Sequence, residues 1–264
     1  MQVVNNGEFC TPTAPKVRRT LALLLFRANQ IVDMEALIDE LWDDHPPRSA
    51  VTTSQTYIYQ LRKAFGRSFG DEEASRILAT RPPGYGLYVS DDQLDANMFE
   101  RLADEGRELH ERGRLEDASR RLHEALSLWR GRVLADVSAG KILEAHVVRL
   151  EEMRIRTTQL HVQTRLQLGR HLELVPELRA LVADHPLNEW FHAQLITVLR
   201  HTGRRGEALN AYQSLRKVLH DELGIEPTIP LQRLQRSLLS RDEGHWPGPI
   251  PVQPVTVTGS SVAS

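Results

Sequence analysis

The chain has 264 residues, of which 41% are hydrophobic and 26% are charged, and its formal net charge is −2. This composition is ordinary for a globular protein of about two domains, and it excludes a fibrous or a wholly disordered chain. The near-neutral charge also excludes a global field that would draw the protein onto nucleic acid or acidic lipid, so any such binding must use a local patch.

A short hairpin is predicted at the N-terminus. Residues 2–4 and 8–10 flank Asn5-Asn6-Gly7, and an Asn-Gly pair supplies the positive φ angles of a tight turn. Two helices are predicted next, over residues 15–28 and 34–42, because apolar residues recur in both at helical spacing. The paired prolines Pro46 and Pro47 then interrupt the chain, since proline disfavours helix before it.

The third predicted helix, residues 48–65, has two chemically different sides. The core-facing stripe at helical spacing comprises Ser54, Ile58, Leu61 and Phe65. The far side carries hydroxyl, amide and ammonium groups and no carboxylate, from Ser49, Thr52, Thr56, Tyr59, Gln60 and Lys63. This surface, with Arg48, Arg62 and Arg67 around it, suits phosphates and base edges, which offer mostly acceptors. An ordinary solvated helix face is the alternative interpretation.

Residues 77–80 and 87–89 are short β-prone runs on either side of a Pro- and Gly-rich turn at 81–86. A hairpin, three helices and a final hairpin describe a winged helix-turn-helix, whose third helix enters the major groove while the wing touches the DNA backbone or minor groove. We therefore expect Arg76, Arg81 and Tyr85 to lie near DNA. For each of them, a plain exposed loop residue is the alternative.

From residue 95 onward the pattern changes to amphipathic helices with an internal repeat. Gly113, Gly169 and Gly203 are each followed by apolar residues at offsets of 5, 9 and 12, and the last two glycines are 34 residues apart. That separation is the tetratricopeptide period, and the longer interval from Gly113 indicates an inserted helix or extended loop around residues 131–140. Such helix pairs usually bind protein on a concave surface.

Several classes of protein lack support in the sequence. The one cysteine, Cys10, excludes a disulfide framework within the chain and favours a reducing cytoplasm. No apolar run approaches the ~18 residues of a transmembrane helix, so we expect no membrane association. Phosphate-loop, dinucleotide-binding, nucleophile-elbow and zincin motifs are missing. We therefore expect no enzyme activity, no cofactor and no metal.

Three segments resemble a known family. They are ALIDELWDDHPPRSAVTTSQTYIYQLRKAFG at 36–66, RPPGYGLYV at 81–89 and RRGEALNAYQSLRKVLHDELGIEPTIPLQRL at 204–234. Together they are similar to the small, stand-alone members of the Streptomyces antibiotic regulatory protein (SARP) family, transcriptional activators of secondary-metabolite gene clusters in actinobacteria.

The resemblance implies a mainly α fold with small β-hairpins. An OmpR-type winged helix-turn-helix would occupy residues 1–92, an all-α tetratricopeptide-like bacterial transcriptional activation domain residues 93–242, and a disordered tail residues 243–264. Family members usually begin with an additional apolar strand that ends near a Leu-Gly turn, whereas Met1 falls at the following strand. We expect either a start further upstream or an N-terminal sheet that lacks this strand.

The family's function would be to bind tandem direct repeats near a promoter, as a homodimer on double-stranded DNA, and to recruit RNA polymerase holoenzyme. This implies a cytoplasmic, nucleoid-associated protein. The acidic second helix would point away from DNA, because like charge repels phosphate, and the candidates for contacting polymerase are Asp43, Asp44, His45, Pro46 and Pro47. A protein-interaction scaffold without specific DNA binding is the main alternative, and an enzyme with an unrecognised centre in the repeat groove is a weaker one.

Overall fold

The computed structural model describes residues 1–240, so the predicted disordered tail at 243–264 lies outside the described residues. The chain divides into two compact units. The first contains Met1–Glu105 and His123–Thr157, and the second contains Gly106–Leu122 and the residues from Thr158 onward. The division falls inside the helices that follow the wing, whereas the whole predicted winged-helix segment belongs to the first unit. Among residues 1–240, no helix is both long and apolar enough to cross a membrane.

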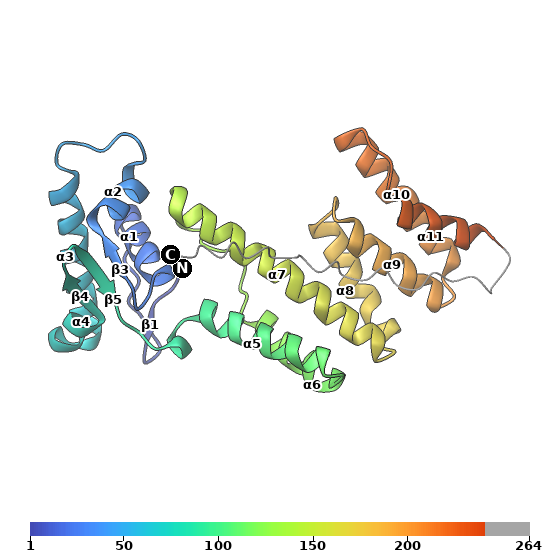
Figure 1. Cartoon of the computed structure of the whole chain (residues 1–264), viewed down its shortest axis with the longest axis horizontal. Coiled ribbons are helices and arrows are strands. Elements are labelled where there is room, and N and C mark those ends of the chain that lie inside the picture. Colours follow the sequence, from blue (N-terminus) through green and yellow to red (C-terminus); the bar gives the residue numbers. More distant parts are fainter. Residues whose placement is uncertain (241–264) are drawn as a thin grey trace, which may run out of the picture. The chain divides into compact units, whose positions relative to one another are not determined.

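The winged helix-turn-helix predicted for the N-terminal part is confirmed (Figure 1). Its elements are β1 (Val4–Asn5), β2 (Glu8–Phe9), α1 (Pro15–Phe26), β3 (Ile31–Asp33), α2 (Met34–Trp42), α3 (Ala50–Phe69), α4 (Asp71–Ile77), β4 (Leu78–Arg81) and β5 (Gly84–Leu87). β1 and β2 pair antiparallel around Asn6 and Gly7, whose φ angles of 48° and 86° are those of the expected tight turn. Within the described residues this N-terminal sheet has two strands.

The wing differs from the predicted hairpin. β4, β5 and β3 form one antiparallel sheet in the order β3-β5-β4, so the hairpin has a third strand that the sequence reading missed. The turn expected over residues 81–86 is also wrong, because β5 already begins at Gly84. A Cβ atom on Gly84 would lie 1.9 Å from the carbonyl oxygen of Val32, so a glycine is needed where β5 meets β3.

The core of the winged helix is built from α1, α2, α3 and the sheet. The predicted stripe of α3 is confirmed, since Ser54, Ile58, Leu61 and Phe65 are all buried. Leu143, which follows the wing by more than fifty residues in sequence, is fully buried in this same core. Leu134, Val137 and Ile142 pack against the core from the outside. The segment 134–143 therefore completes the hydrophobic core of the DNA-binding part.

The remaining helices form the expected repeat of helix pairs. They are α5 (Asp95–Glu111), α6 (Leu115–Ser127), α7 (Lys141–Gln167), α8 (His171–Asp184), α9 (Glu189–His201), α10 (Arg205–Leu223) and α11 (Ile229–Leu239). Gly113, Gly169 and Gly203 lie between the members of three pairs, with φ angles of 74°, 75° and 74°. Their shared left-handed conformation ends the first helix of each pair. The long first interval comes from the extended loop over residues 128–140 and from α7, which has 27 residues against 13 in α9.

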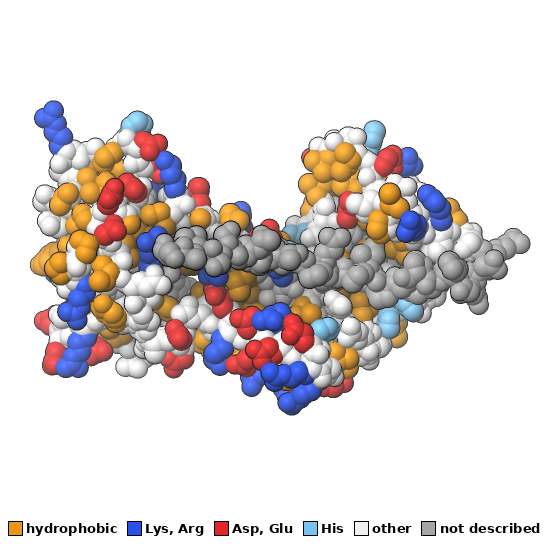
Figure 2. All heavy atoms as spheres, in the orientation of Figure 1, with side chains coloured by type: hydrophobic (Ala, Val, Ile, Leu, Met, Phe, Trp, Pro, Cys, Tyr) orange, Lys and Arg blue, Asp and Glu red, His pale blue; other side chains and the backbone are white. Residues whose placement is uncertain are grey.

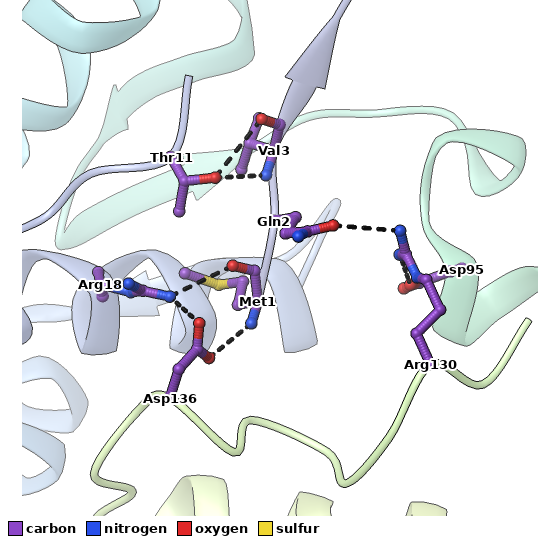
Figure 3. Close-up of polar contacts among 8 residues, drawn as sticks. All are labelled: Met1, Gln2, Val3, Thr11, Arg18, Asp95, Arg130 and Asp136. Atoms are coloured by element: carbon purple, nitrogen blue, oxygen red, sulfur yellow. Dashed lines mark hydrogen bonds and ion pairs between the residues drawn. The ribbon is translucent and has the colours of Figure 1, made fainter. Parts of the chain in front are cut away.

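The loop between α6 and α7 is fastened to the N-terminal hairpin and to α1 (Figure 3). Asp136 accepts hydrogen bonds from the amino group of Met1, at 2.6 Å, and from the guanidinium of Arg18. These cations, the amino group first, hold the pKa of Asp136 below its ordinary value. Arg130 donates to Gln2 at 3.2 Å and to Asp95 at 3.0 Å. The loop thus forms polar contacts before and among its apolar contacts with the winged-helix core.

Candidate nucleic-acid interface

The outward face of α3 is the first part of the candidate interface. Thr52, Thr56, Gln60 and Lys63 are exposed, as the sequence predicts, and Tyr59 exposes 63% of its surface. Helix α3 contains no carboxylate over its 20 residues. The surface of α5 and α6 is different, because acidic and basic side chains alternate there (Figure 2) in pairs such as Arg101–Glu105 and Arg114–Asp117. The α3 face therefore has donor groups and cations that are not neutralised on the same helix.

The N-terminal end of α3 adds to this positive surface. Arg48 and Ser49 are exposed directly before the helix, and its first turn contains no acidic residue. The Ser49 side chain does not cap the helix, and its hydroxyl instead lies 3.4 Å from that of Thr53. Backbone N–H groups and the helix dipole make such an end favourable for a phosphate. Arg67 is exposed near the other end of the helix.

Arg62 has a role that the sequence did not predict. Its Nε donates to the carbonyl of Leu78 at 3.0 Å, and its Nη2 donates to the hydroxyl of Thr80 at 2.8 Å. The guanidinium also lies 5.9 Å from the ring centroid of Tyr85. These contacts join α3 to the wing and hold the half-buried Arg62 side chain against β4.

Tyr85 is not the exposed wing residue that we expected. It lies in β5, opposite Val32 on one side and Thr80 on the other, and only 9% of its surface is exposed. The extra strand β3 makes β5 the central strand of the sheet, and the side chain of Tyr85 packs into the winged-helix core. Its aromatic ring contributes to packing and to holding Arg62.

The other wing residues lie at a groove of about 620 Å³. Its lining comprises Arg62, Ser75, Arg76, Ala79, Thr80, Arg81 and Tyr88. Arg76 is exposed but is paired with Glu72 at 2.6 Å and with Glu73 at 3.6 Å. Arg81 is exposed and is the last residue of β4, the strand that Arg62 contacts. Arg81 is therefore better placed than Arg76 to offer an uncompensated charge to a phosphate.

The turn after α2 is exposed throughout, from Asp43 to Pro47. Asp44 accepts from the ammonium group of Lys141 at 3.1 Å, and this hydrogen bond raises the pKa of Lys141 above its ordinary value. Such an exposed pair contributes little stability, but it occupies one of the two acids in the turn. Asp43 and His45 remain as the polar candidates for a partner protein.

Glu40 is the residue that sequence reasoning missed. It belongs to the acidic helix α2, which we expected to point away from DNA, and its side chain is fully buried. Its carboxylate accepts hydrogen bonds from three backbone N–H groups at the start of α7, those of Gly140, Ile142 and Leu143, at 2.6, 3.1 and 3.0 Å. One signal was present, because Glu40 lies between Ala36 and Leu37 around its helix, at the edge of the apolar side. Its partners, a hundred residues away, could not be inferred.

Comparisons with known proteins agree with this architecture. A family model described as "Transcriptional regulatory protein, C terminal" matches residues 10–87, and one described as "Bacterial transcriptional activator domain" matches residues 94–239. The regulatory protein DnrI of Streptomyces peucetius is 45% identical over 243 residues, which cover 91% of this chain and 89% of DnrI. The chain belongs to the SARP family. It is a SARP-type transcriptional activator with a DNA-binding domain.

Longer SARP-related regulators match over only part of their length. The regulatory protein AfsR of Streptomyces coelicolor is 35% identical over 90% of this chain, which corresponds to 23% of AfsR. EmbR of Mycobacterium tuberculosis is 34% identical over 90% of this chain and 61% of EmbR. The solved structure of EmbR in complex with a low-affinity phosphopeptide superposes with a TM-score of 0.80, covering 90% of this chain and 62% of that one. Both SARP domains are therefore found together in these relatives.

Proposed function

We propose that the protein activates a secondary-metabolite gene cluster, such as one for an antibiotic, by binding tandem direct repeats in promoter DNA and recruiting RNA polymerase. The observation that carries this proposal is the exposed, carboxylate-free face of α3 beside the wing. Binding to chromosomal DNA would place the protein in the cytoplasm, at the nucleoid.

The exposed side chains divide into two roles on DNA. Arg48, Arg67 and Arg81 would contact phosphates, which give affinity without sequence preference. Gln60 would pair with an adenine through both atoms of its amide, and the methyl groups of Thr52 and Thr56 would meet thymine methyls. Lys63 would donate to a guanine or to a phosphate. Two protomers on one face of the DNA would read repeats spaced by about one helical turn, near 10 to 10.5 bp.

Recruitment of RNA polymerase is the second part of the proposal. The exposed turn after α2 offers Asp43 and His45, together with Pro46 and Pro47, on an acidic element that DNA would repel. Substituting Asp43 by Asn removes the charge and keeps the shape. We expect Asp43→Asn to lower transcript yield at saturating protein while DNA affinity is unchanged, with the exposed Asp221→Asn as the matched control. Equal yields from the two variants would remove Asp43 from the polymerase contact.

The DNA-binding part is tested by mobility shift with a salt titration on promoter DNA from the gene's own neighbourhood, with excess competitor DNA. We expect Lys63→Ala to weaken binding and, if Lys63 contacts a phosphate, to lower the salt slope by about one. Lys217→Ala is the matched control, since Lys217 is also an exposed lysine, on α10. Unchanged affinity in Lys63→Ala would take this residue off the DNA face. No specific, salt-dependent binding by the wild-type protein would favour the scaffold alternative instead.

A further inference from the structure

We propose that Glu40 is a positioning residue that couples DNA recognition to transcriptional activation. It would do so by holding the start of α7, a helix of the activation domain, against the winged helix. The inference rests on the proposed function and adds to it a named contact between the two activities. Its starting point is a charged side chain that is fully buried and yet has no side-chain cation as its partner among the described contacts.

The carboxylate of Glu40 replaces a cap that α7 lacks in its own sequence. Ala139 and Gly140 precede the helix and have no side-chain acceptor. The first backbone N–H groups of a helix have no partner within the helix, and a carboxylate there is favoured by the helix dipole. Glu40 supplies acceptors to three such groups through both of its oxygens. Removing it would leave buried donors without partners.

The backbones of α2 and of the residues before α7 also lie close together at this contact. A Cβ atom on Gly140 would lie 2.3 Å from the carbonyl oxygen of Glu40, so only glycine allows α7 to start so near α2. That same carbonyl accepts from Arg19 at 3.1 Å, and Arg19 also donates to Ser138 at 2.9 Å. α1, α2 and the residues before α7 therefore meet at one point.

Contacts before and after Gly140 hold the start of α7 against α1 and α2, and we call this contact the junction. Leu143, in the first turn of α7, is buried in the winged-helix core. Arg18 pairs with Asp136 in the preceding loop (Figure 3). None of these residues belongs to the exposed face of α3 or to the wing. The junction can therefore transmit the position of the DNA-bound helices to α7 without itself contacting DNA.

The test compares Glu40→Gln with Glu35→Gln, the same change at an exposed position of α2. Gln has the size of Glu, but an NH₂ donor replaces one of the two acceptor oxygens. That donor would face backbone N–H groups, which need an acceptor. We expect amide exchange at residues 140–143 to become about tenfold faster in Glu40→Gln. We expect operator affinity to stay within about threefold of wild type, and transcript yield at a fully occupied promoter to fall. A role in stability alone would not lower the yield at full occupancy.

Gly140→Ala disturbs the same contact from the side of α7. If Glu40→Gln does not fold, this second variant tests the coupling. We expect it also to bind the operator and to activate poorly. Wild-type yield at full occupancy from both variants, despite faster exchange at 140–143, would overturn the coupling. Unchanged exchange in Glu40→Gln would show that Glu40 does not hold α7. A wild-type protein that binds no promoter DNA would instead refute the proposed function on which the coupling rests.

Discussion

Arg62 shows how a single side chain of α3 can support the wing through contacts within the protein. Its guanidinium donates to β4 at two points and lies near the ring of Tyr85. The sequence places Arg62 beside Lys63, and residue type alone makes both of them phosphate ligands. The difference between them arises from a strand sixteen residues later in the chain, which local spacing cannot reveal.

This role predicts an unusual response to substitution. Arg62→Ala should lower DNA affinity by misplacing the wing while leaving the salt slope unchanged, because no phosphate contact is lost. Arg62→Lys should not restore affinity, since an ammonium lacks the planar fork that reaches two acceptors. Salt titrations of the mobility shift measure both quantities. A slope lower by about one in Arg62→Ala would return Arg62 to the DNA contacts.

Gln60 provides the corresponding test of base reading. Its amide is exposed on α3 with no partner among the described contacts that would divert it. Gln60→Ala should cost about 1 to 3 kcal/mol on the preferred site if the contact to adenine is bidentate. The loss should disappear on operators altered at that one base pair, which competition between operator variants measures. Equal weakening on every operator would rule out base reading by Gln60.

At the scale of elements, the helices are predicted well and the sheet is not. α2 and the stripe of α3 match the sequence expectation because a helix is specified by local spacing. β3 and the first half of β5 were missed because their pairing joins residues more than fifty positions apart. Gly84 reinforced the error, since a glycine that permits close strand approach looks like a turn residue in sequence. α4 (Asp71–Ile77) was missed as well, having a single buried residue, Ala74, and thus no apolar period.

The helix α9 carries a prediction about pH. His192 is buried, and its Nε2 donates to the carbonyl of Pro186 at 3.0 Å. Burial lowers the pKa of His192 below its ordinary value, so the unfolded chain takes up a proton at a higher pH than the folded one. Stability should therefore be full above about pH 6.5 and fall as the pH drops below it.

His192→Gln isolates this contribution, because a Gln amide can donate to the same carbonyl and does not titrate. We expect the variant to lose less stability than wild type between neutral and mildly acid pH, measured by urea unfolding at each pH. His220→Gln, at an exposed position of α10, serves as a control for an altered histidine. A wild-type loss that persists unchanged in His192→Gln would assign the pH dependence to other groups.

At the scale of the whole molecule, the DNA-binding part depends on residues outside its own sequence segment. The matched families divide between residues 87 and 94, and a boundary at residue 92 stays a prediction from the sequence. The winged-helix core nevertheless includes Leu143 and the segment before it. No periodicity within residues 1–92 could indicate that a residue from the activation domain would complete this core.

Leu143→Ala tests that dependence. Removing a fully buried leucine leaves a cavity, which typically costs about 2 to 5 kcal/mol. Because the cavity would lie in the winged-helix core, we expect amide-exchange protection to fall in α1 and α3 as well as in α7. The exposed Leu172 of α8 gives a control, as Leu172→Ala removes no buried contact. Reduced protection limited to α7 would mean that the winged helix is stable without this segment.

The central claim, that this chain reads promoter DNA through α3 and its wing, is tested most directly by footprinting. The wild-type protein and Lys63→Ala would be titrated on the DNA upstream of neighbouring genes. We predict that the wild-type protein protects two direct repeats about one helical turn apart. At the concentration where the wild-type protein protects both repeats, Lys63→Ala should protect neither. Protection that is absent, or that spreads over the DNA without preference and is the same for both proteins, would contradict the account.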